Sequence, residues 1–261
     1  MRAVALHNDV LVATSAIWQT NCVVVREGEE CFLIDSPILP EELDALPALV
    51  ERARFPTPSG LLATHGDWDH LLGRLAFTAS PLACAETTAA RLQGALGEAQ
   101  RELRAFDEKF LIARRRPLAL GRVQALPVPG LCGIGARELE LHRADGHAED
   151  GMAISIPWAS VLATGDYLSA VEIPSLATAG GSADAYLATL ARLRTLVQMS
   201  GHVVPGHGPV LDAARALKIL EEDLTYLAAL TEQGIRAELP ANRRSKAQTL
   251  VHERNVAQVL S

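Results

Sequence analysis

Short runs of alternating or continuous apolar residues recur in two parts of the chain, and such runs are typical of β-strands. In the first part they predict strands at residues 3–6, 10–13, 22–26, 31–35, 61–64 and 81–85. In the second part, which begins near Arg122, they predict strands at residues 123–128, 138–142, 152–157, 160–164 and 203–204. Each part therefore holds enough strands to build a sheet of its own.

Apolar residues spaced three or four positions apart predict helices after each group of strands. The predicted helices cover residues 40–54, 70–77, 87–113 and 184–199, and a C-terminal part, 211–261, is helical with its last helix near 245–260. Residues 87–113 are predicted as one long amphipathic helix because Leu92, Leu96, Leu103 and Phe106 fall at helical spacing. Two strand-rich halves with helices after each favour a mixed α/β (α+β) fold in which two facing sheets lie between helices.

Composition and charge exclude several classes of protein. Hydrophobic residues make up 49% of the 261 positions and charged residues 21%, as in an ordinary globular protein. The formal net charge of −7 disfavours a general nucleic-acid binder, which would carry a basic surplus. The apolar runs are shorter than the ~20 residues of a membrane span, and the first residues do not resemble a signal peptide. We therefore expect a cytoplasmic protein with neither a nucleic-acid nor a membrane partner.

The stretch from Leu61 to Leu72 concentrates side chains that can ligate metal. A predicted strand runs into a polar turn that carries His65, Asp67, Asp69 and His70, and apolar residues at helical spacing follow. Buried carboxylates and imidazoles need a partner, and a divalent cation satisfies both kinds of group. The alternative is that the aspartates cap a helix and the histidines lie on the surface.

Three later stretches share this character. Each is an apolar segment that ends in a turn of small residues, and in each a glycine directly precedes the polar side chain: His147, Asp166 and His207. Glycine lets the backbone turn tightly, so that the side chain can point into a shared cavity. Four such turns in one chain are much stronger evidence for a metal site than one.

In this order the motifs resemble those of the metallo-β-lactamase-fold hydrolase superfamily, whose signature is His-x-His-x-Asp-His followed by Gly-His, Gly-Asp and Pro-Gly-His-Gly. The resemblance covers about residues 3–210. It implies a four-layer αββα sandwich at residues 1–210, with residues 211–261 as a C-terminal helical extension packed on the same domain. It also implies a two-metal site, with His65, residue 67 and His147 at the first metal, Asp69, His70 and His207 at the second, and Asp166 bridging them.

Asp67 departs from the family signature, which has a histidine at this position. A third carboxylate makes the site less positive, which should acidify its water less and favour harder metals. Aspartate is also shorter than histidine, so one expectation is that Asp67 contacts the metal through a water molecule and that the first metal position is weak or empty. Flavodiiron proteins of the same superfamily carry a carboxylate here. We expect two divalent ions, with Zn²⁺ as the first choice and Fe or Mn as alternatives, and a solvated turn aspartate remains the alternative role of Asp67.

The resemblance implies a metal-dependent hydrolase that uses metal-bound hydroxide to cleave an ester, thioester, lactone or similar bond of a small substrate. Asp67 and Asp69 are the residues expected to take part in catalysis. Trp68 and Tyr167, each beside an expected ligand, are predicted to line the substrate cleft, with simple packing as the alternative. Helix 87–113 and the C-terminal helices are expected to form its wall.

Three alternatives to a hydrolase remain open at this stage. They are an iron-dependent redox enzyme on the same fold, a non-catalytic protein with a degenerate metal site, and a nuclease, which the acidic charge balance disfavours. The sequence leaves the oligomeric state open, a homodimer included.

Overall fold

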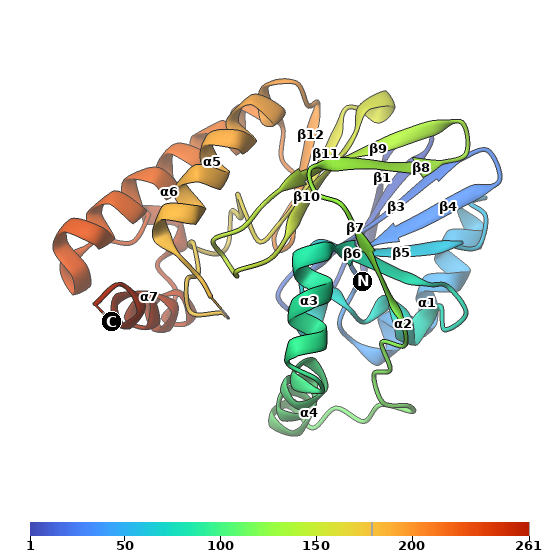
Figure 1. The fold of residues 1–261 in the computed structure, drawn as a ribbon, viewed down its shortest axis with the longest axis horizontal. Coiled ribbons are helices and arrows are strands. Elements are labelled where there is room, and N and C mark those ends of the chain that lie inside the picture. The colour runs from blue at the N-terminus through green and yellow to red at the C-terminus, as the bar shows by residue number, and fades with distance from the viewer. Residues whose placement is uncertain (179, 261) are drawn as a thin grey trace.

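The computed structural model describes residues 1–178 and 180–260, without the side chain of Leu260, and folds them into two facing β-sheets with helices outside (Figure 1). The strands of the larger sheet, which lie in sequence order, are β1 (Arg2–His7), β2 (Val10–Thr14), β3 (Asn21–Glu27), β4 (Glu30–Ile34), β5 (Gly60–Ala63), β6 (Leu82–Ala85) and β7 (Val123–Leu126). Strands β1 to β4 are antiparallel neighbours, whereas β4 to β7 are parallel. The parallel strands therefore all end at the same edge of the sheet.

The smaller sheet has the order β12-β11-β10-β9-β8. Its strands are β8 (Gly130–Ile134), β9 (Arg137–Arg143), β10 (Met152–Ile156), β11 (Val161–Gly165) and β12 (His202–Pro205). All its neighbouring strands are antiparallel except β11 and β12, which are parallel. Strands β11 and β12 consequently end at the same edge of the sheet, and the turns that follow them lie next to each other.

Successive side chains of a strand point to opposite faces of its sheet, and this alternation produces the layers of the fold. In β2, Val10 and Val12 face the other sheet and join a core with Ile154 and other residues of the smaller sheet. Leu11 and Ala13 point to the opposite face and pack in a separate core under the first group of helices. Both faces of this strand are apolar because helices cover one face and a sheet covers the other.

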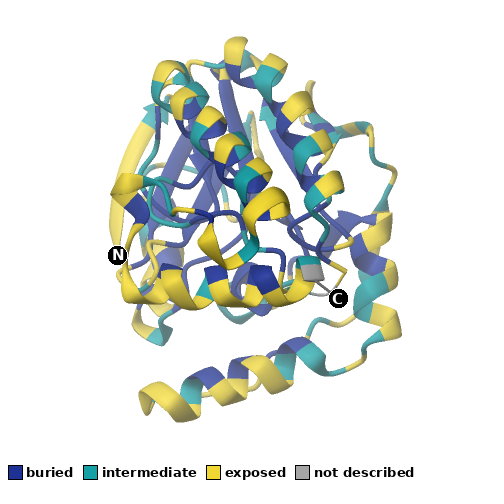
Figure 2. Ribbon diagram, turned by 90° about the vertical axis from the view of Figure 1, so that its left-hand side faces the viewer, coloured by how far each residue is buried: buried dark blue, intermediate teal, exposed yellow. Residues whose placement is uncertain are grey.

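The helices form the two outer layers. They are α1 (Pro40–Arg52), α2 (Gly73–Ala76), α3 (Glu86–Gly94) and α4 (Glu98–Phe110) on the side of the larger sheet, and α5 (Ala183–Gln198), α6 (Ala213–Gln233) and α7 (Lys246–Leu260) on the side of the smaller sheet. Figure 2 shows buried strands in the interior and exposed residues on the outer faces of the helices. The predicted αββα arrangement with C-terminal helices is thus confirmed. A domain boundary at residue 210 stays a prediction.

Two predictions about the elements were wrong in detail, and one strand was missed. The single helix expected at residues 87–113 is two helices, α3 and α4, because Gly97 adopts φ = 78° between them and α4 stops at Phe110. Strand β7, expected to open the second sheet, pairs with β6 in the larger sheet. Strand β8 carries glycines and no clear apolar run, and it was not predicted. None of the described helices is both long and apolar enough to cross a membrane.

Candidate metal centre

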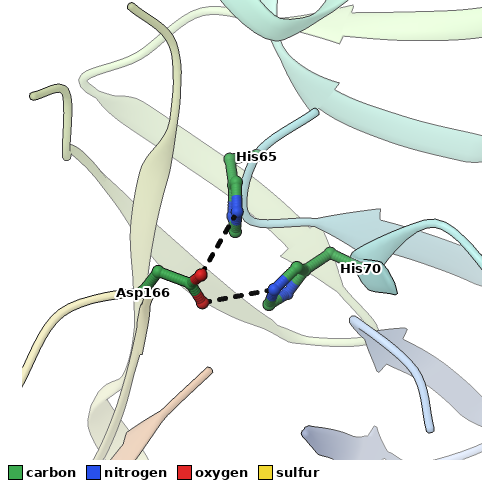
Figure 3. Close-up of side chains that lie close together, drawn as sticks. All are labelled: His65, His70 and Asp166. Atoms are coloured by element: carbon green, nitrogen blue, oxygen red, sulfur yellow. Dashed lines mark ion pairs between the residues drawn. The ribbon is translucent and has the colours of Figure 1, made fainter. Parts of the chain in front are cut away.

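Four turns at one edge of the sandwich bring together the seven predicted ligands. The turn after β5 supplies His65, Asp67, Asp69 and His70, the loop after β9 supplies His147, and the turns after β11 and β12 supply Asp166 and His207. Their ligand-type atoms form overlapping groups in which all members lie within 4.8 Å of one another. Figure 3 shows the side chains of His65 and His70, from the turn after β5, converging with that of Asp166, from the turn after β11.

The first group contains His65, Asp67 and His147. Oδ2 of Asp67 lies 3.3 Å from Nε2 of His147 and 3.7 Å from Nε2 of His65. Both histidines are buried, and the carboxylate of Asp67 is only partly exposed. Asp67 therefore lies with two histidines in a group that could hold a metal ion and is not a fully solvated turn residue.

The second group contains Asp69, His70 and His207. Oδ2 of Asp69 lies 3.3 Å from Nε2 of His207 and 3.8 Å from Nε2 of His70. All three residues are buried. The two groups thus have the same composition, two imidazoles and one carboxylate, which suits several divalent transition metals.

Asp166 lies between the groups and gives one oxygen to each. Oδ2 is 3.5 Å from Nε2 of His147 and 3.8 Å from Nε2 of His65, in the first group. Oδ1 is 3.2 Å from Nε2 of His70 and 3.4 Å from Nε2 of His207, in the second group. This placement is the one that a bridging ligand requires.

The four histidines are held so that Nε2 faces the cavity. In three rings the outer nitrogen, Nδ1, has a hydrogen-bond partner: Thr64 Oγ1 at 3.0 Å for His65, Ser175 O at 3.1 Å for His147, and Trp18 O at 3.2 Å for His207. In the fourth, Nδ1 of His70 lies 3.0 Å from Oδ2 of Asp35 in an ion-pair contact. Such partners set the orientation of a ligating ring and raise its basicity. The rings are therefore orientated before any metal binds.

Asp35 has a structural part in this arrangement. It follows β4 with φ = 56°, and its two carboxylate oxygens accept hydrogen bonds from the backbone N–H and the hydroxyl of Thr64, both at 2.8 Å. One of these oxygens also faces His70. Asp35 thereby ties the end of one strand to the turn that carries four of the ligands.

Three unsatisfied atoms of the site match what a metal would use. In the described chain, Nε2 of His65, Nε2 of His70 and Oδ1 of Asp166 are buried, face the cavity and have no hydrogen-bond partner, and Nδ1 of His70, which faces Asp35 instead, also has none. Buried polar groups are nearly always paired, since leaving one unpaired costs about 1–3 kcal/mol. Three unpaired atoms that point into one cavity are better explained by a site for metal ions than by hydrogen bonds among the side chains themselves.

Without metal, the acids and bases of the site share protons. Burial would lower the pKa of His70, but the negative charges of Asp35, Asp166 and Asp69 outweigh it and raise this pKa well above its ordinary value. Burial would raise the pKa of Asp166, but the charge of His207 and the other histidines holds it well below its ordinary value. Metal ions must therefore compete with protons for the imidazoles.

Metal uptake by the stripped protein is accordingly expected to release protons and to weaken as the pH falls. The pKa values of His70, His147 and His207 are all raised. As the pH is lowered, the metal affinity should therefore already begin to fall at a pH above ~6.5, at which a free imidazole would still be mostly neutral. Calorimetric titration with Zn²⁺ in buffers of different ionisation enthalpy measures the released protons. Binding at pH 7 without proton release would contradict this expectation.

Three residues near the site gave no signal in the sequence. Arg91 of α3 lies beside Asp67, with 2.8 Å between Nη2 and Oδ1, and also pairs with the buried Asp150. Glu172 lies with Asp166 and His207 in a further group of possible ligands. A lone arginine on a helix and a glutamate in a loop have no local feature that separates them from surface charges.

An open cleft of about 490 Å³ adjoins the metal ligands. Trp68 lines it, as predicted, and its ring packs against Trp18 and Phe106 with centroids 5.7 Å and 4.7 Å away. Helices α4 and α7 also contribute residues, so both segments predicted to form its wall reach it. The structure thus places a small-molecule-sized space directly over the site.

The prediction for Tyr167 was wrong. The residue is 2% exposed and is not part of the cleft wall. Its ring packs on Tyr186, and its hydroxyl accepts a hydrogen bond of 3.0 Å from the backbone N–H of His147. Tyr167 therefore supports the loop that carries a ligand instead of contacting a substrate.

A Gly206→Ala substitution is expected to weaken metal binding by about 10-fold or more. A Cβ atom at Gly206 would overlap Oδ1 of Asp166 and come within 3.0 Å of the His70 ring. Gly201→Ala, on the other side of β12, is the matched control, since its Cβ would meet only ordinary contacts with Ser160. Competition with a chromophoric chelator measures both affinities, and equal values in the two variants would refute the steric argument.

Comparisons with known proteins agree with this geometry. Residues 16–225 match the sequence profile of the metallo-beta-lactamase superfamily. No curated protein matches the chain in sequence. Among solved structures, TTHA1623 in a di-iron-bound form is 23% identical with a TM-score of 0.62, over 80% of this chain and 97% of that one.

Two further solved structures extend the comparison. The BLEG-1 B3 metallo-beta-lactamase is 20% identical with a TM-score of 0.60, over 79% of this chain and 95% of that one. The stereoselective inverting sec-alkylsulfatase Pisa1 from Pseudomonas sp. is 13% identical with a TM-score of 0.79, over 98% of this chain and 49% of that one. These likenesses show a shared fold, and the profile matches most of the chain. The chain therefore belongs to the metallo-beta-lactamase superfamily.

Proposed function

We propose that the protein is a metal-dependent hydrolase of a small substrate that contains an ester, thioester, lactone or similar bond. The observation that carries this proposal is the convergence of four Nε2 atoms and three carboxylates on one cavity beside an open cleft. His65, Asp67 and His147 would hold one ion, Asp69, His70 and His207 would hold the other, and Asp166 would serve both. When bound, two divalent ions supply Lewis acidity and lower the pKa of a water molecule at the site.

The chain's own residues position the reaction and handle its protons. Asp67 and Asp69 both line the cleft, and each presents Oδ2 to a pair of histidines. Either carboxylate can accept a hydrogen bond from a water molecule that attacks a substrate in the cleft. Thr64, Asp35 and the backbone carbonyls behind the rings keep the imidazoles in place while this happens.

The walls of the cleft favour a small substrate with an apolar part. Trp18, 44% exposed, and Trp68 offer aromatic surface on one side, and Val251 and Arg254 of α7 contribute an apolar and a cationic side chain on another. The volume of about 490 Å³ lies within the range of small-molecule sites. The net charge of −7 supports a small molecule over nucleic acid as the substrate.

Metal analysis joined to a substrate panel tests the proposal. The protein is purified from its own host, its Zn, Fe and Mn contents are measured per chain, and ester, thioester, lactone and phosphodiester substrates are assayed before and after removal of metal with a chelator. We expect about two ions per chain and a hydrolytic activity that disappears with the metal and returns when it is added back. A chain that binds no Zn²⁺, Fe²⁺ or Mn²⁺ would instead support a degenerate, non-catalytic site.

An iron-dependent redox enzyme is the second candidate, and the donor set is the observation that favours it. Carboxylates are numerous, because Glu172 lies with Asp166 and His207 in addition to Asp67 and Asp69. Oxygen ligands favour harder metals than thiolates do, and the similar structure of TTHA1623 is a di-iron-bound form. Anaerobic purification with iron analysis and an oxygen-uptake assay separates the two functions, since a hydrolase consumes no oxygen.

A further inference from the structure

Arg91 reaches from α3 into the space behind the first group of ligands. Its side chain is only 8% exposed, and its two terminal nitrogens serve different carboxylates. Nη2 donates to Oδ1 of Asp67 and Nη1 donates to Oδ1 of Asp150, each at 2.8 Å. An arginine with an almost fully buried side chain that joins the buried Asp150 to the partly exposed Asp67 should be held firmly in place, because removing it leaves an uncompensated charge.

The two oxygens of Asp67 have different surroundings. Oδ1 is occupied by Arg91, whereas Oδ2 faces Nε2 of His147 and Nε2 of His65 in the cavity. The hydrogen bond from the guanidinium to Oδ1 therefore fixes the orientation of the carboxylate, so that Oδ2 points to the metal position. An aspartate without such a partner could rotate about its last torsion, which is broad for this side chain, and present either oxygen or neither.

Asp150 and Gly66 complete the support. Oδ2 of Asp150 accepts a hydrogen bond of 2.9 Å from the backbone N–H of Gly66, which lies next to Asp67 in the chain. A Cβ atom at Gly66 would come within 3.3 Å of both Arg91 and Asp150. The absence of a side chain at Gly66 therefore leaves space for the ion pair between Arg91 and Asp150. Hydrogen bonds thus connect Arg91 to Asp67, Arg91 to Asp150, and Asp150 to the backbone of Gly66 in the turn.

We infer that Arg91 is the positioning residue that allows an aspartate to serve as a metal ligand at position 67. The inference rests on the proposed metal centre and adds to it a residue for which the family signature has no counterpart. A neutral histidine at position 67 would need no cation behind it. The effect of Arg91 on metal binding should therefore depend on the carboxylate at this position, whereas its loss should destabilise the fold with either residue, since Asp150 loses its partner in both cases.

A double-mutant cycle on metal affinity tests this dependence. The variants are Arg91→Met, Arg91→Lys, Asp67→His and the double variant Asp67→His/Arg91→Met, each stripped of metal and titrated with Zn²⁺ against a chromophoric chelator. Arg91→Met should weaken the first ion by about 10- to 100-fold, the usual cost of losing the partner of a ligand. In the Asp67→His background the same change should cost less than about 3-fold, since the group that it orientates is gone.

Three features of the experiment separate a positioning role from general damage. Urea unfolding should show destabilisation by Arg91→Met in both backgrounds, because Asp150 loses its partner in each, so that a loss of metal affinity confined to the aspartate background is not a loss of folding. The ion at Asp69, His70 and His207 should keep its affinity within about 3-fold, as this group does not contact Arg91. Arg91→Lys should retain part of the affinity, because an ammonium can reach one carboxylate but cannot bridge two.

Arg104→Met is the matched control. Arg104 is an exposed arginine of α4 that makes no ion pair in the described chain, and its loss should leave both ions unchanged. Equal losses of metal affinity from Arg91→Met with aspartate and with histidine at position 67 would overturn the inference while leaving the metal centre intact. Failure of the unmodified chain to bind Zn²⁺ at all would instead overturn the proposed function.

Discussion

An Asp166→Ala variant is expected to lose at least one of its two ions and to fall in kcat/KM by about 10³-fold or more, equivalent to about 4 kcal/mol of transition-state stabilisation. The reason is the position of this carboxylate, which gives Oδ2 to His65 and His147 and Oδ1 to His70 and His207. Removing it leaves two separate groups with four imidazoles and no common anion. The measurements are metal per chain by elemental analysis and hydrolysis of the best substrate from the panel.

Asp184→Ala is the control for this variant, since Asp184 is exposed in the first turn of α5 and contributes to no group of possible ligands in the described chain. It should keep both ions and full activity. Asp166→Ala makes no change to the backbone carbonyl of residue 166, which accepts a hydrogen bond of 3.1 Å from Tyr186. Two retained ions and unchanged kcat/KM in Asp166→Ala would disprove the dinuclear assignment.

An Arg243→Leu variant is expected to lose about 3–5 kcal/mol of its free energy of unfolding, the usual cost of breaking a buried ion pair. Arg243 is 2% exposed, and its Nη1 lies 2.5 Å from Oδ1 of the equally buried Asp223 in α6. The same nitrogen donates to the carbonyls of Ser169 and Glu172. Loss of the guanidinium leaves a buried carboxylate and two carbonyls without their donor.

The neighbouring residue supplies the control. Arg244 has a side chain that is 54% exposed and pairs with Glu238 at 2.8 Å, so that Arg244→Leu should cost only about 0–1 kcal/mol. Urea unfolding of the metal-free proteins measures both free energies. Similar values for the two variants would show that the buried pair contributes no more than a surface pair.

The loss in Arg243→Leu should also grow with pH. Burial raises the pKa of Asp223 to about 7 although Arg243 opposes the shift, and without the arginine this pKa rises further. An acid whose pKa is raised by folding loses stability as the pH rises, up to its pKa in the folded state. The wild type therefore stops losing stability from this group near pH 7, whereas the variant continues to lose it, and unfolding at pH 6 and pH 8 measures the difference.

The same ion pair connects the C-terminal helices to the metal centre. Arg243 holds the backbone of Ser169, and the hydroxyl of Ser169 donates a hydrogen bond of 2.8 Å to the carbonyl of His207. Further along the same loop, the backbone N–H of Ile173 donates a hydrogen bond of 2.8 Å to the side chain of Gln248 in α7. Residues beyond position 210 thus fasten the segment that closes one side of the cleft.

The sequence by itself determined the layers and which residues gather as candidate metal ligands. Alternating apolar residues place Val10 and Val12 on one face of a strand and Leu11 and Ala13 on the other, which is a property of extended backbone. Polar side chains after glycine or at a strand end mark the turns of the site, and these signals need only a few neighbouring residues. For this reason all seven predicted ligands lie together in the structure.

Only the tertiary structure decided how Asp67 is held and what surrounds the ligands. Arg91 and Asp150 are far from each other in sequence, and nothing near either residue shows that α3 brings them together behind Asp67. In the same way, Tyr167 follows a ligand in sequence but is buried on Tyr186, because the packing of α5 against β11 determines its side. Local patterns specify the direction of the chain and the face of an element, whereas ion pairs between distant elements depend on how those elements pack, and the packing is settled by the whole core.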